Sequence, residues 1–285
     1  MPGESIQTLL EPDQIRENPY LQELADEEIR VVFGSREING GSEERERKNL
    51  QIAAAIFAQK YKEQKDKKRL IGSTGKILAK FFDRLDIGVR PTLRQLAEIR
   101  LVHEYYQKIF GDEYPSIRRG FLAEHAAMRS VSDSLHKKFA KRYDTDPANA
   151  PRVEYPTSTE DRLHKADFIV NLESEIGKNI MVQVKCLPLE PLEGKQRRVL
   201  YPIRNLGNIT EMMRDIGYAV EDHDEFVGTG ERMLALYEEN SNTEFAFMIL
   251  PSPDWEVARF NQLTGLPSED LTEHVYLELN KNYLS

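Results

Sequence analysis

Asp167-Phe168-Ile169-Val170-Asn171-Leu172 is an apolar, β-rich run, and Asn179-Ile180-Met181-Val182-Gln183-Val184-Lys185-Cys186 is a second one close behind it. The short polar segment between them carries Gly177 near its end, which is typical of a tight turn. Two such runs joined by a turn predict a β-hairpin at the centre of the fold.

Polar side chains interrupt the second run on one face. Side chains alternate along a strand, so Met181, Gln183 and Lys185 share a face, while Ile180 and Val182 lie on the other. A glutamine and a lysine are costly to bury without partners. A metal ion and a bound phosphate would supply such partners, so this face is a candidate site.

A long helix is predicted upstream, from Ser116 to Arg142. Its apolar residues recur at helical spacing, and Glu124 falls in phase with them in the gap between Phe121 and Met128. A carboxylate on a core-facing stripe is uncommon. The structural alternative is a half-buried glutamate paired with a nearby arginine. The stripe consists of Ile117, Phe121, Met128, Val131, Leu135 and Phe139.

The order of a helix with Glu124, a strand with Asp167 and a strand with Gln183-Val184-Lys185 resembles the PD-(D/E)XK nuclease superfamily. In this chain Ala166 stands where the family has proline, and Gln183 stands where it usually has a second acid. The resemblance spans roughly residues 115 to 250. It implies catalytic roles for Glu124, Asp167, Gln183 and Lys185.

The resemblance also implies a cofactor and a mechanism. The cofactor is Mg²⁺, for which Mn²⁺ can substitute, with Glu124, Asp167, Gln183 and the Val184 carbonyl as ligands. Lys185 would orient the attacking water or offset charge on the scissile phosphate. The reaction is metal-assisted hydrolysis of DNA phosphodiester bonds.

The expected fold class is α/β (α+β) with a restriction-endonuclease-like αβββαβ core. A short strand at Arg152 to Tyr155 begins the core, and the tail is expected to be helical from Asp254 to Leu263 and strand-like from His274 to Leu279. The later core elements are helices at Asn208 to Tyr218 and Gly230 to Asn240, and a buried strand at Glu244 to Leu250.

Residues 1–112 are expected to form an N-terminal helical domain, which either packs on the nuclease core or binds DNA or a partner, and residues 113–285 the nuclease-like domain. Helices are predicted at Ser42 to Lys67, Gly75 to Leu85 and Thr92 to Phe110. The run from Arg90 to Ala97 faintly resembles the entry to a helix-turn-helix unit, although Pro91-Thr92 is also simply a good helix start.

The net charge of −9 argues against a protein that coats nucleic acid, but local cations matter more than the total. One basic cluster follows the Lys185 strand within about 20 residues, and we expect it to contact DNA. A solvated charged face is the alternative explanation. The cluster consists of Lys195, Arg197, Arg198 and Arg204, with Tyr201 beside it as a stacking surface.

Several classes are excluded. No apolar stretch of 18 or more residues appears and the first residues do not look like a signal peptide, so a cytoplasmic protein without a membrane partner is expected. The single cysteine, Cys186, excludes an internal disulfide. There is no glycine-rich phosphate loop, and the histidines make no metal-binding pair.

The sequence therefore predicts a Mg²⁺-dependent endonuclease acting on DNA, for which restriction or defence is the attractive role. One alternative is a catalytically inactive nuclease-fold subunit that binds DNA or assembles with other proteins. Another is a helix-turn-helix transcriptional regulator. DNA is the expected partner, and assembly as a homodimer is left open.

Overall fold

The computed structural model describes residues 111–156, 166–189, 197–218, 224–239, 242–252, 259–262 and 264–284, together with Ile99, His103 and Gln107. By its internal contacts the chain divides into two compact units, Met1–Leu122 and Ala123–Ser285. The division falls inside a helix, ten residues beyond the boundary expected at residue 112. The fold described below is that of the second unit.

A five-stranded mixed sheet forms the centre of this unit, with the order β1-β2-β3-β5-β4. Strands β1, β2 and β3 form an antiparallel meander, β3 and β5 are parallel, and β4 and β5 are antiparallel. The strands are β1 (Arg152–Glu154), β2 (Phe168–Leu172), β3 (Lys178–Leu187), β4 (Leu200–Ile203) and β5 (Thr243–Pro251). The expected mixed α/β class is confirmed.

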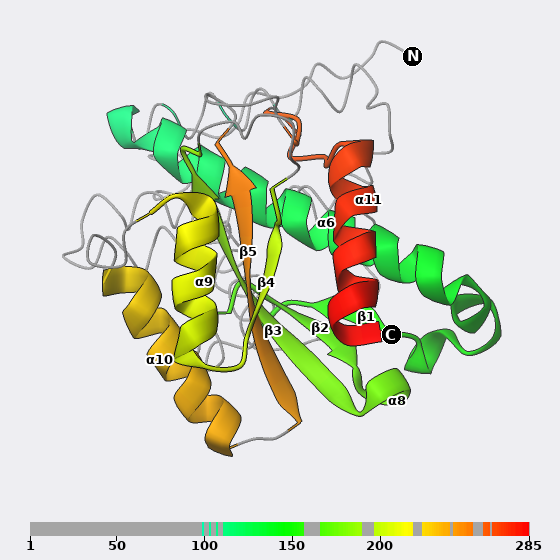
Figure 1. The fold of residues 1–285 in the computed structure, drawn as a ribbon. Helices are drawn as coiled ribbons and strands as arrows, with labels where there is room; N and C mark the ends of the chain where they lie inside the picture. The colour runs from blue at the N-terminus through cyan, green and yellow to red at the C-terminus, as the bar shows by residue number, and fades with distance from the viewer. Residues whose placement is uncertain are drawn as a thin grey trace, which may run out of the picture. The chain divides into compact units, whose positions relative to one another are not determined.

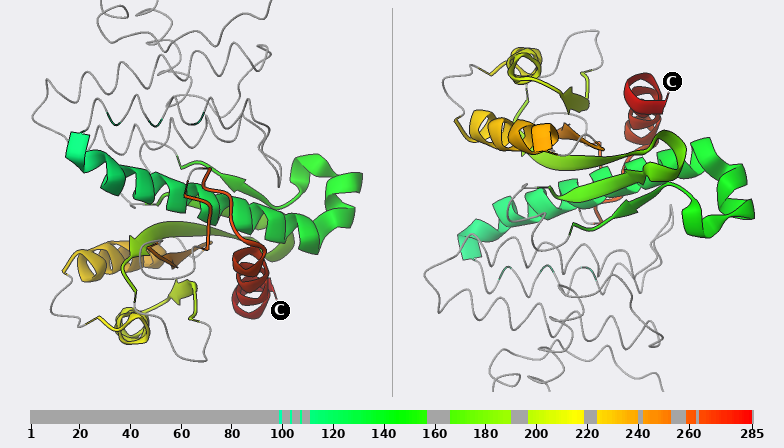
Figure 2. Two further views of the ribbon diagram at one scale, coloured as in Figure 1. Left: turned by 90° about the horizontal axis from the view of Figure 1, so that it is seen from above. Right: turned by 90° about the horizontal axis from the view of Figure 1, so that it is seen from below.

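Helices cover both faces of the sheet. Figures 1 and 2 show α6 (Tyr114–Thr145) crossing one face, with α9 (Leu206–Ile216), α10 (Asp224–Glu239) and α11 (Glu269–Leu279) on the other. Parallel neighbours such as β3 and β5 require a crossover connection, and β4, α9 and α10 provide it. The shorter elements are η1 (Gly111–Glu113), η2 (Pro147–Asn149), α8 (Glu173–Ile176) and the π-helical turn η4 (Asn280–Leu284).

The hairpin predicted from the sequence is present, with β2 and β3 within one or two residues of the expected limits. The turn contains the single helical turn α8, and Gly177 ends it with φ 68°, a conformation that favours glycine. Helix α6 also matches its prediction: Phe121, Met128 and Val131 are buried, whereas Glu124 is half-buried.

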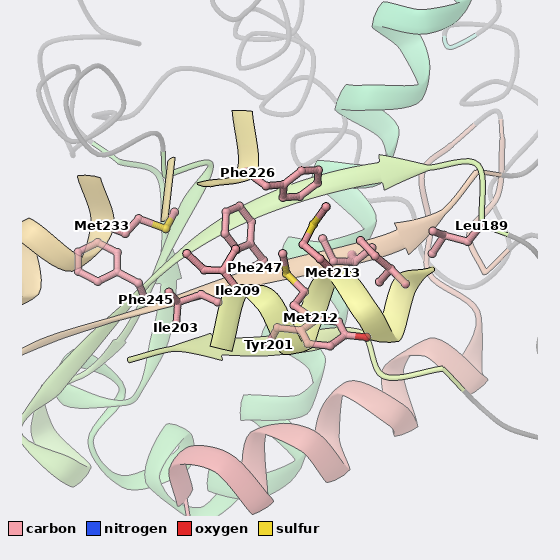
Figure 3. Close-up of a cluster of buried hydrophobic side chains, with 12 residues drawn as sticks. Leu189, Tyr201, Ile203, Ile209, Met212, Met213, Phe226, Met233, Phe245 and Phe247 are labelled. Carbon is pink, nitrogen blue, oxygen red and sulfur yellow. The ribbon is translucent and has the colours of Figure 1, made fainter. Parts of the chain in front are cut away.

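An apolar core fills the space between the sheet and helices α9 and α10 (Figure 3). Aromatic and aliphatic side chains of β5 pack there against methionines of both helices, and Phe226 of α10 lies 5.4 Å from Phe247 between ring centroids. The members are Leu189, Tyr201, Ile203, Ile209, Met212, Met213, Ile216, Phe226, Met233, Phe245, Phe247 and Ile249.

The expectations for the outer parts of the sheet hold less well, and the strand expected at the C-terminal end was wrong. Residues His274 to Leu279 are helical, within α11, because Ser268 caps the helix at Leu271 N and the apolar residues then recur at helical spacing. Most of the expected helix at Asp254 to Leu263 lies outside the described residues, and its described residues 259–262 are not helical, with Phe260 bridging Pro267. Strand β4 was not predicted, because Pro202 interrupts a short edge segment.

The N-terminal predictions lie outside the described residues, apart from Ile99, His103 and Gln107, each of which is helical. Among helices of the described part, none is long and apolar enough to cross a membrane.

The contact between α9 and α10 gives a first prediction. A Cβ atom at Gly230 would collide with the side chain of Ile209, which is 2 % exposed, whereas a Cβ at Gly228 would meet no atom within 4 Å. We expect Gly230→Ala to lower the free energy of unfolding by about 1–3 kcal/mol. Gly228→Ala is the matched control, and it should raise that free energy by about 0.5–1 kcal/mol. Urea denaturation measures both, and equal effects of the two substitutions would contradict this packing.

Candidate functional site

The carboxylate of Asp167 ties the start of β2 to the middle of β3. Its Oδ2 accepts hydrogen bonds from Gln183 Nε2 at 2.9 Å and from the Val184 backbone N at 2.6 Å. Its own backbone N donates to Val182 O at 2.8 Å. Strand β2 begins only at Phe168, so no residue of β2 pairs with Val184 of β3. The Asp167 side chain accepts from the Val184 backbone N in place of a backbone carbonyl. Asp167 and Gln183 are therefore brought together as predicted.

The backbone of Val184 faces the same corner. In an extended strand the N–H and C=O of one residue point toward the same neighbour. Because the Val184 N–H points at Asp167, its carbonyl also points toward the side where β2 begins. The carboxylate and the amide thus meet at this end of the hairpin, and the Val184 carbonyl faces the same side.

Lys185 lies on the same face of β3 as Gln183. The parallel register pairs Gln183 with Phe247 and Lys185 with Ile249, and both partners belong to the core under α9 and α10. The Lys185 Nζ lies 5.9 Å from the centroid of the Phe226 ring, within range of a cation–π interaction. Lys185 is half-buried.

Glu124 comes from the opposite layer. It lies on α6, which crosses the face of the sheet opposite to α9 and α10, whereas Gln183 and Lys185 point to the α10 side. Helical phase predicted a carboxylate on the core-facing stripe, and Glu124 is half-buried in the structure. The helical periodicity of α6 does not determine which face of the sheet the helix covers. The convergence of Glu124 with the other three residues stays a prediction.

The oxygen atoms near Asp167 are candidate ligands for a divalent cation. Within the described residues, no three His, Cys, Asp or Glu side chains lie together as a metal site. Mg²⁺ needs fewer, because it is often held by one or two carboxylates and keeps several waters. Neighbouring ligands in its octahedral shell lie about 3 Å apart.

The 2.9 Å between Asp167 Oδ2 and Gln183 Nε2 matches that separation. The two ends of a glutamine amide are assigned from hydrogen bonding, and turning the amide would present Oε1 beside the carboxylate. Asp167, Gln183 and the Val184 carbonyl therefore fit a Mg²⁺ ion as an incomplete, oxygen-rich set.

The arginines of the basic cluster after β3 differ in how far they are exposed. Arg197 is only 8 % exposed, and its Nη1 donates to Asp215 O at 2.7 Å. Arg198 and Arg204 are partly exposed, with 33 % and 50 % of their side chains accessible. Lys195 lies outside the described residues. Arg198 and Arg204 are therefore more accessible to a ligand than Arg197 is.

A buried carboxylate in β5 was missed from the sequence. Glu244 is 6 % exposed, and it accepts from Lys178 Nζ at 2.6 Å and from Arg204 Nη2 at 3.0 Å. Burial by itself raises the pKa of the Glu244 carboxyl, but the hydrogen bonds and charges of Lys178 and Arg204 outweigh it and hold that pKa below its ordinary value. The missed signal was a glutamate at the start of a strand that is otherwise apolar.

A second buried carboxylate, Glu278 of α11, supports the edge strand. It accepts from the backbone N of Leu200 at 2.6 Å and from His274 Nε2 at 3.0 Å. Arg259 Nη1 lies 3.1 Å from the other ring nitrogen of His274. This chain of contacts fixes β4 against α11, and it has the partners expected of a structural network.

No family model matches the chain, and neither the curated proteins nor the solved structures contain a match to it.

Proposed function

We propose that this protein is a Mg²⁺-dependent endonuclease that hydrolyses DNA phosphodiester bonds, with a PD-(D/E)XK-like core. The observation that carries the proposal is the meeting of Asp167, Gln183 and the Val184 backbone at the start of β2. Strand pairing alone does not require an acid, an amide and a following lysine at this corner. A hydrolytic site for a phosphodiester has a use for all three, as ligands of a cation and as a positive charge beside the phosphate.

The order of elements supports the same proposal. Helix α6 is followed by the meander β1-β2-β3, then by helices α9 and α10 and the parallel strand β5. This order is compatible with the expected helix, three strands, helix and strand, with β4 as an addition at the edge. The acid stands at the first residue before β2, and the Gln-x-Lys tripeptide stands within β3.

Each residue has a distinct role in the proposed reaction. Asp167, Gln183 and the Val184 carbonyl hold the divalent cation, which when bound polarises the phosphate and makes water more acidic. Lys185 offsets the negative charge that develops on the scissile phosphate, and the Phe226 ring restrains its ammonium. Glu124 is assigned to hold a water molecule, and this requires its carboxylate to reach the Asp167 end of the hairpin.

One observation favours the alternative of an inactive subunit with the same core. The Asp167 Oδ2 accepts hydrogen bonds from two groups of the chain itself, the Gln183 amide and the Val184 backbone N. An amide that donates to the carboxylate would keep the corner stable in a protein that has no use for a metal. The two functions differ in one measurable property, cleavage.

The deciding experiment is incubation of the full chain with supercoiled and linear DNA in Mg²⁺, in Mn²⁺ and in excess EDTA. We expect cleavage with either cation and none in EDTA. Binding of DNA without cleavage under all three conditions would support the inactive subunit, and cleavage that persists in EDTA would contradict the mechanism.

The role of Gln183 gives a second prediction. Gln183→Glu would place two carboxylates about 2.9 Å apart without a cation, and repulsion between them would raise the pKa of one. We therefore expect the variant to melt at a lower temperature than the wild type in EDTA, and to bind Mg²⁺ about tenfold more tightly. Thermal melting across a Mg²⁺ series measures both. Gln262→Glu, at an exposed turn, is the control. A stabilisation by Mg²⁺ no larger than in that control would exclude Gln183 as a ligand.

A further inference from the structure

A small pocket opens beside the edge strand β4, away from Asp167. Its volume is about 130 Å³, and it lies where the first turn of α9, the strand β4 and the turn η4 meet. A water molecule in the liquid occupies about 30 Å³, so the pocket has room for a group of several heavy atoms. The lining residues are Arg198, Tyr201, Pro202, Arg204, Asn208, Glu211 and Asn282.

Hydrogen-bond donors dominate this pocket. Arg204 uses Nε and Nη2 for Glu244 and the Asn282 carbonyl, and its Nη1 takes part in none of these contacts. Arg198 uses Nε for Leu200 O, and its guanidinium lies 4.9 Å from the centroid of the Tyr201 ring. The two cations are therefore fixed in place while part of each guanidinium remains available.

Two amides add to the donors. The Oδ1 of Asn208 accepts from the backbone N of Arg204 at 2.9 Å and of Asn205 at 3.2 Å, which leaves its Nδ2 as the end for a ligand. Within the described part of the chain, the Nδ2 of Asn282 is buried and has no hydrogen-bond partner. A buried donor without an acceptor is costly, so it is a sign of a missing partner.

The charges at the pocket also favour an anion. Lys178 and Arg204 share the single negative charge of Glu244, which leaves one positive charge in excess. The only lining carboxylate among the described residues is Glu211. It lies 4.0 Å from Arg198 Nη1 with 57 % of its side chain exposed. Such a loose surface pair contributes little and yields to a stronger ligand.

We infer that this pocket binds a phosphate group through Arg198, Arg204, Asn208 and Asn282. Two guanidinium groups and two amide donors match the several acceptor oxygens and the negative charge of a phosphate. The phosphate belongs either to a nucleic-acid backbone or to a free phosphate or phosphomonoester. The inference does not depend on the proposed nuclease activity, because the pocket is built from β4, α9 and η4.

Titration of the full chain with inorganic phosphate at constant ionic strength, followed by calorimetry, tests the inference. We expect saturable binding that Arg198→Gln weakens about tenfold, the effect of losing a hydrogen bond to a charged group. Glu211→Gln should instead tighten binding, because it removes the competing carboxylate. Arg129→Gln, an equal change of charge at an exposed i,i+4 pair on α6, is the control and should bind as the wild type does.

A second arm identifies the source of the phosphate. A short DNA duplex is titrated into the same proteins without divalent cations. Competition between duplex and inorganic phosphate, with weaker duplex binding by Arg198→Gln, would assign the pocket to a backbone phosphate. Phosphate binding that the duplex does not displace would assign it to a free phosphate or phosphomonoester. Equal phosphate affinity of Arg198→Gln, Glu211→Gln and Arg129→Gln, or no saturable binding, would overturn the inference.

Discussion

Asp167→Asn should reduce Mg²⁺-dependent DNA cleavage by about a thousandfold or more while the protein stays folded. The substitution removes the carboxylate that accepts from both Gln183 Nε2 and the Val184 backbone N. A catalytic cation contributes several kcal/mol to transition-state stabilisation, and each 1.4 kcal/mol corresponds to a factor of ten in rate. Losing its charged ligand should therefore be the largest single effect on activity.

Asparagine is the informative replacement because it separates chemistry from folding. Its amide oxygen can still accept from the Val184 N–H, whereas Asp167→Ala would leave that buried donor and Gln183 Nε2 without their acceptor and cost about 1–3 kcal/mol of stability. Initial cleavage rates and urea denaturation are measured on the same preparations. Asp133→Asn, at an exposed ion pair on α6, is the control. A variant Asp167→Asn that cleaves as fast as the control would remove Asp167 from the mechanism.

The hairpin and its polar corner were predictable because their signals are local. Two β-rich runs around Gly177 determine the pairing of β2 with β3, and alternation then places Gln183 and Lys185 on one face. Helix α6 was predictable for the same reason, since its apolar period runs through Phe121, Met128 and Val131. Each of these inferences needed only one segment of sequence.

Features that depend on contacts between two distant segments could not be predicted from local sequence patterns. The sequence gives no sign that α6 covers the opposite face of the sheet from Lys185, because the layer of a helix is decided by packing. In the sequence, Arg204 cannot be distinguished from an arginine that binds DNA. Its ion-pair partner in the structure, Glu244, lies 40 residues away in β5. The β-rich residues from His274 onward favour a strand in the sequence. In the structure the cap at Ser268, together with packing, makes this segment helical.

The buried charge cluster carries the largest expected effect on stability. Glu244→Gln should lower the free energy of unfolding at pH 7 by about 2 kcal/mol or more. Removing one partner of a fully buried ion pair costs about 3–5 kcal/mol, and the smaller figure applies because Lys178 and Arg204 have 38 % and 50 % of their side chains exposed. Glu231→Gln, at an exposed position of α10, is the control and should change stability by less than about 0.5 kcal/mol.

The same cluster predicts how stability depends on pH. The pKa of the Glu244 carboxyl is lower in the folded protein than its ordinary value of 4.5, because Lys178 and Arg204 favour its charged form. A carboxyl with a lowered pKa stabilises the fold above its unfolded pKa, and this stabilisation is lost as the pH falls through the folded pKa. The difference in stability between the wild type and Glu244→Gln should therefore be constant from pH 7 to about pH 5 and shrink below pH 4.5. Urea denaturation across this pH series measures the difference, and a difference that grows toward acid would mean that Glu244 is not held as a carboxylate by these two cations.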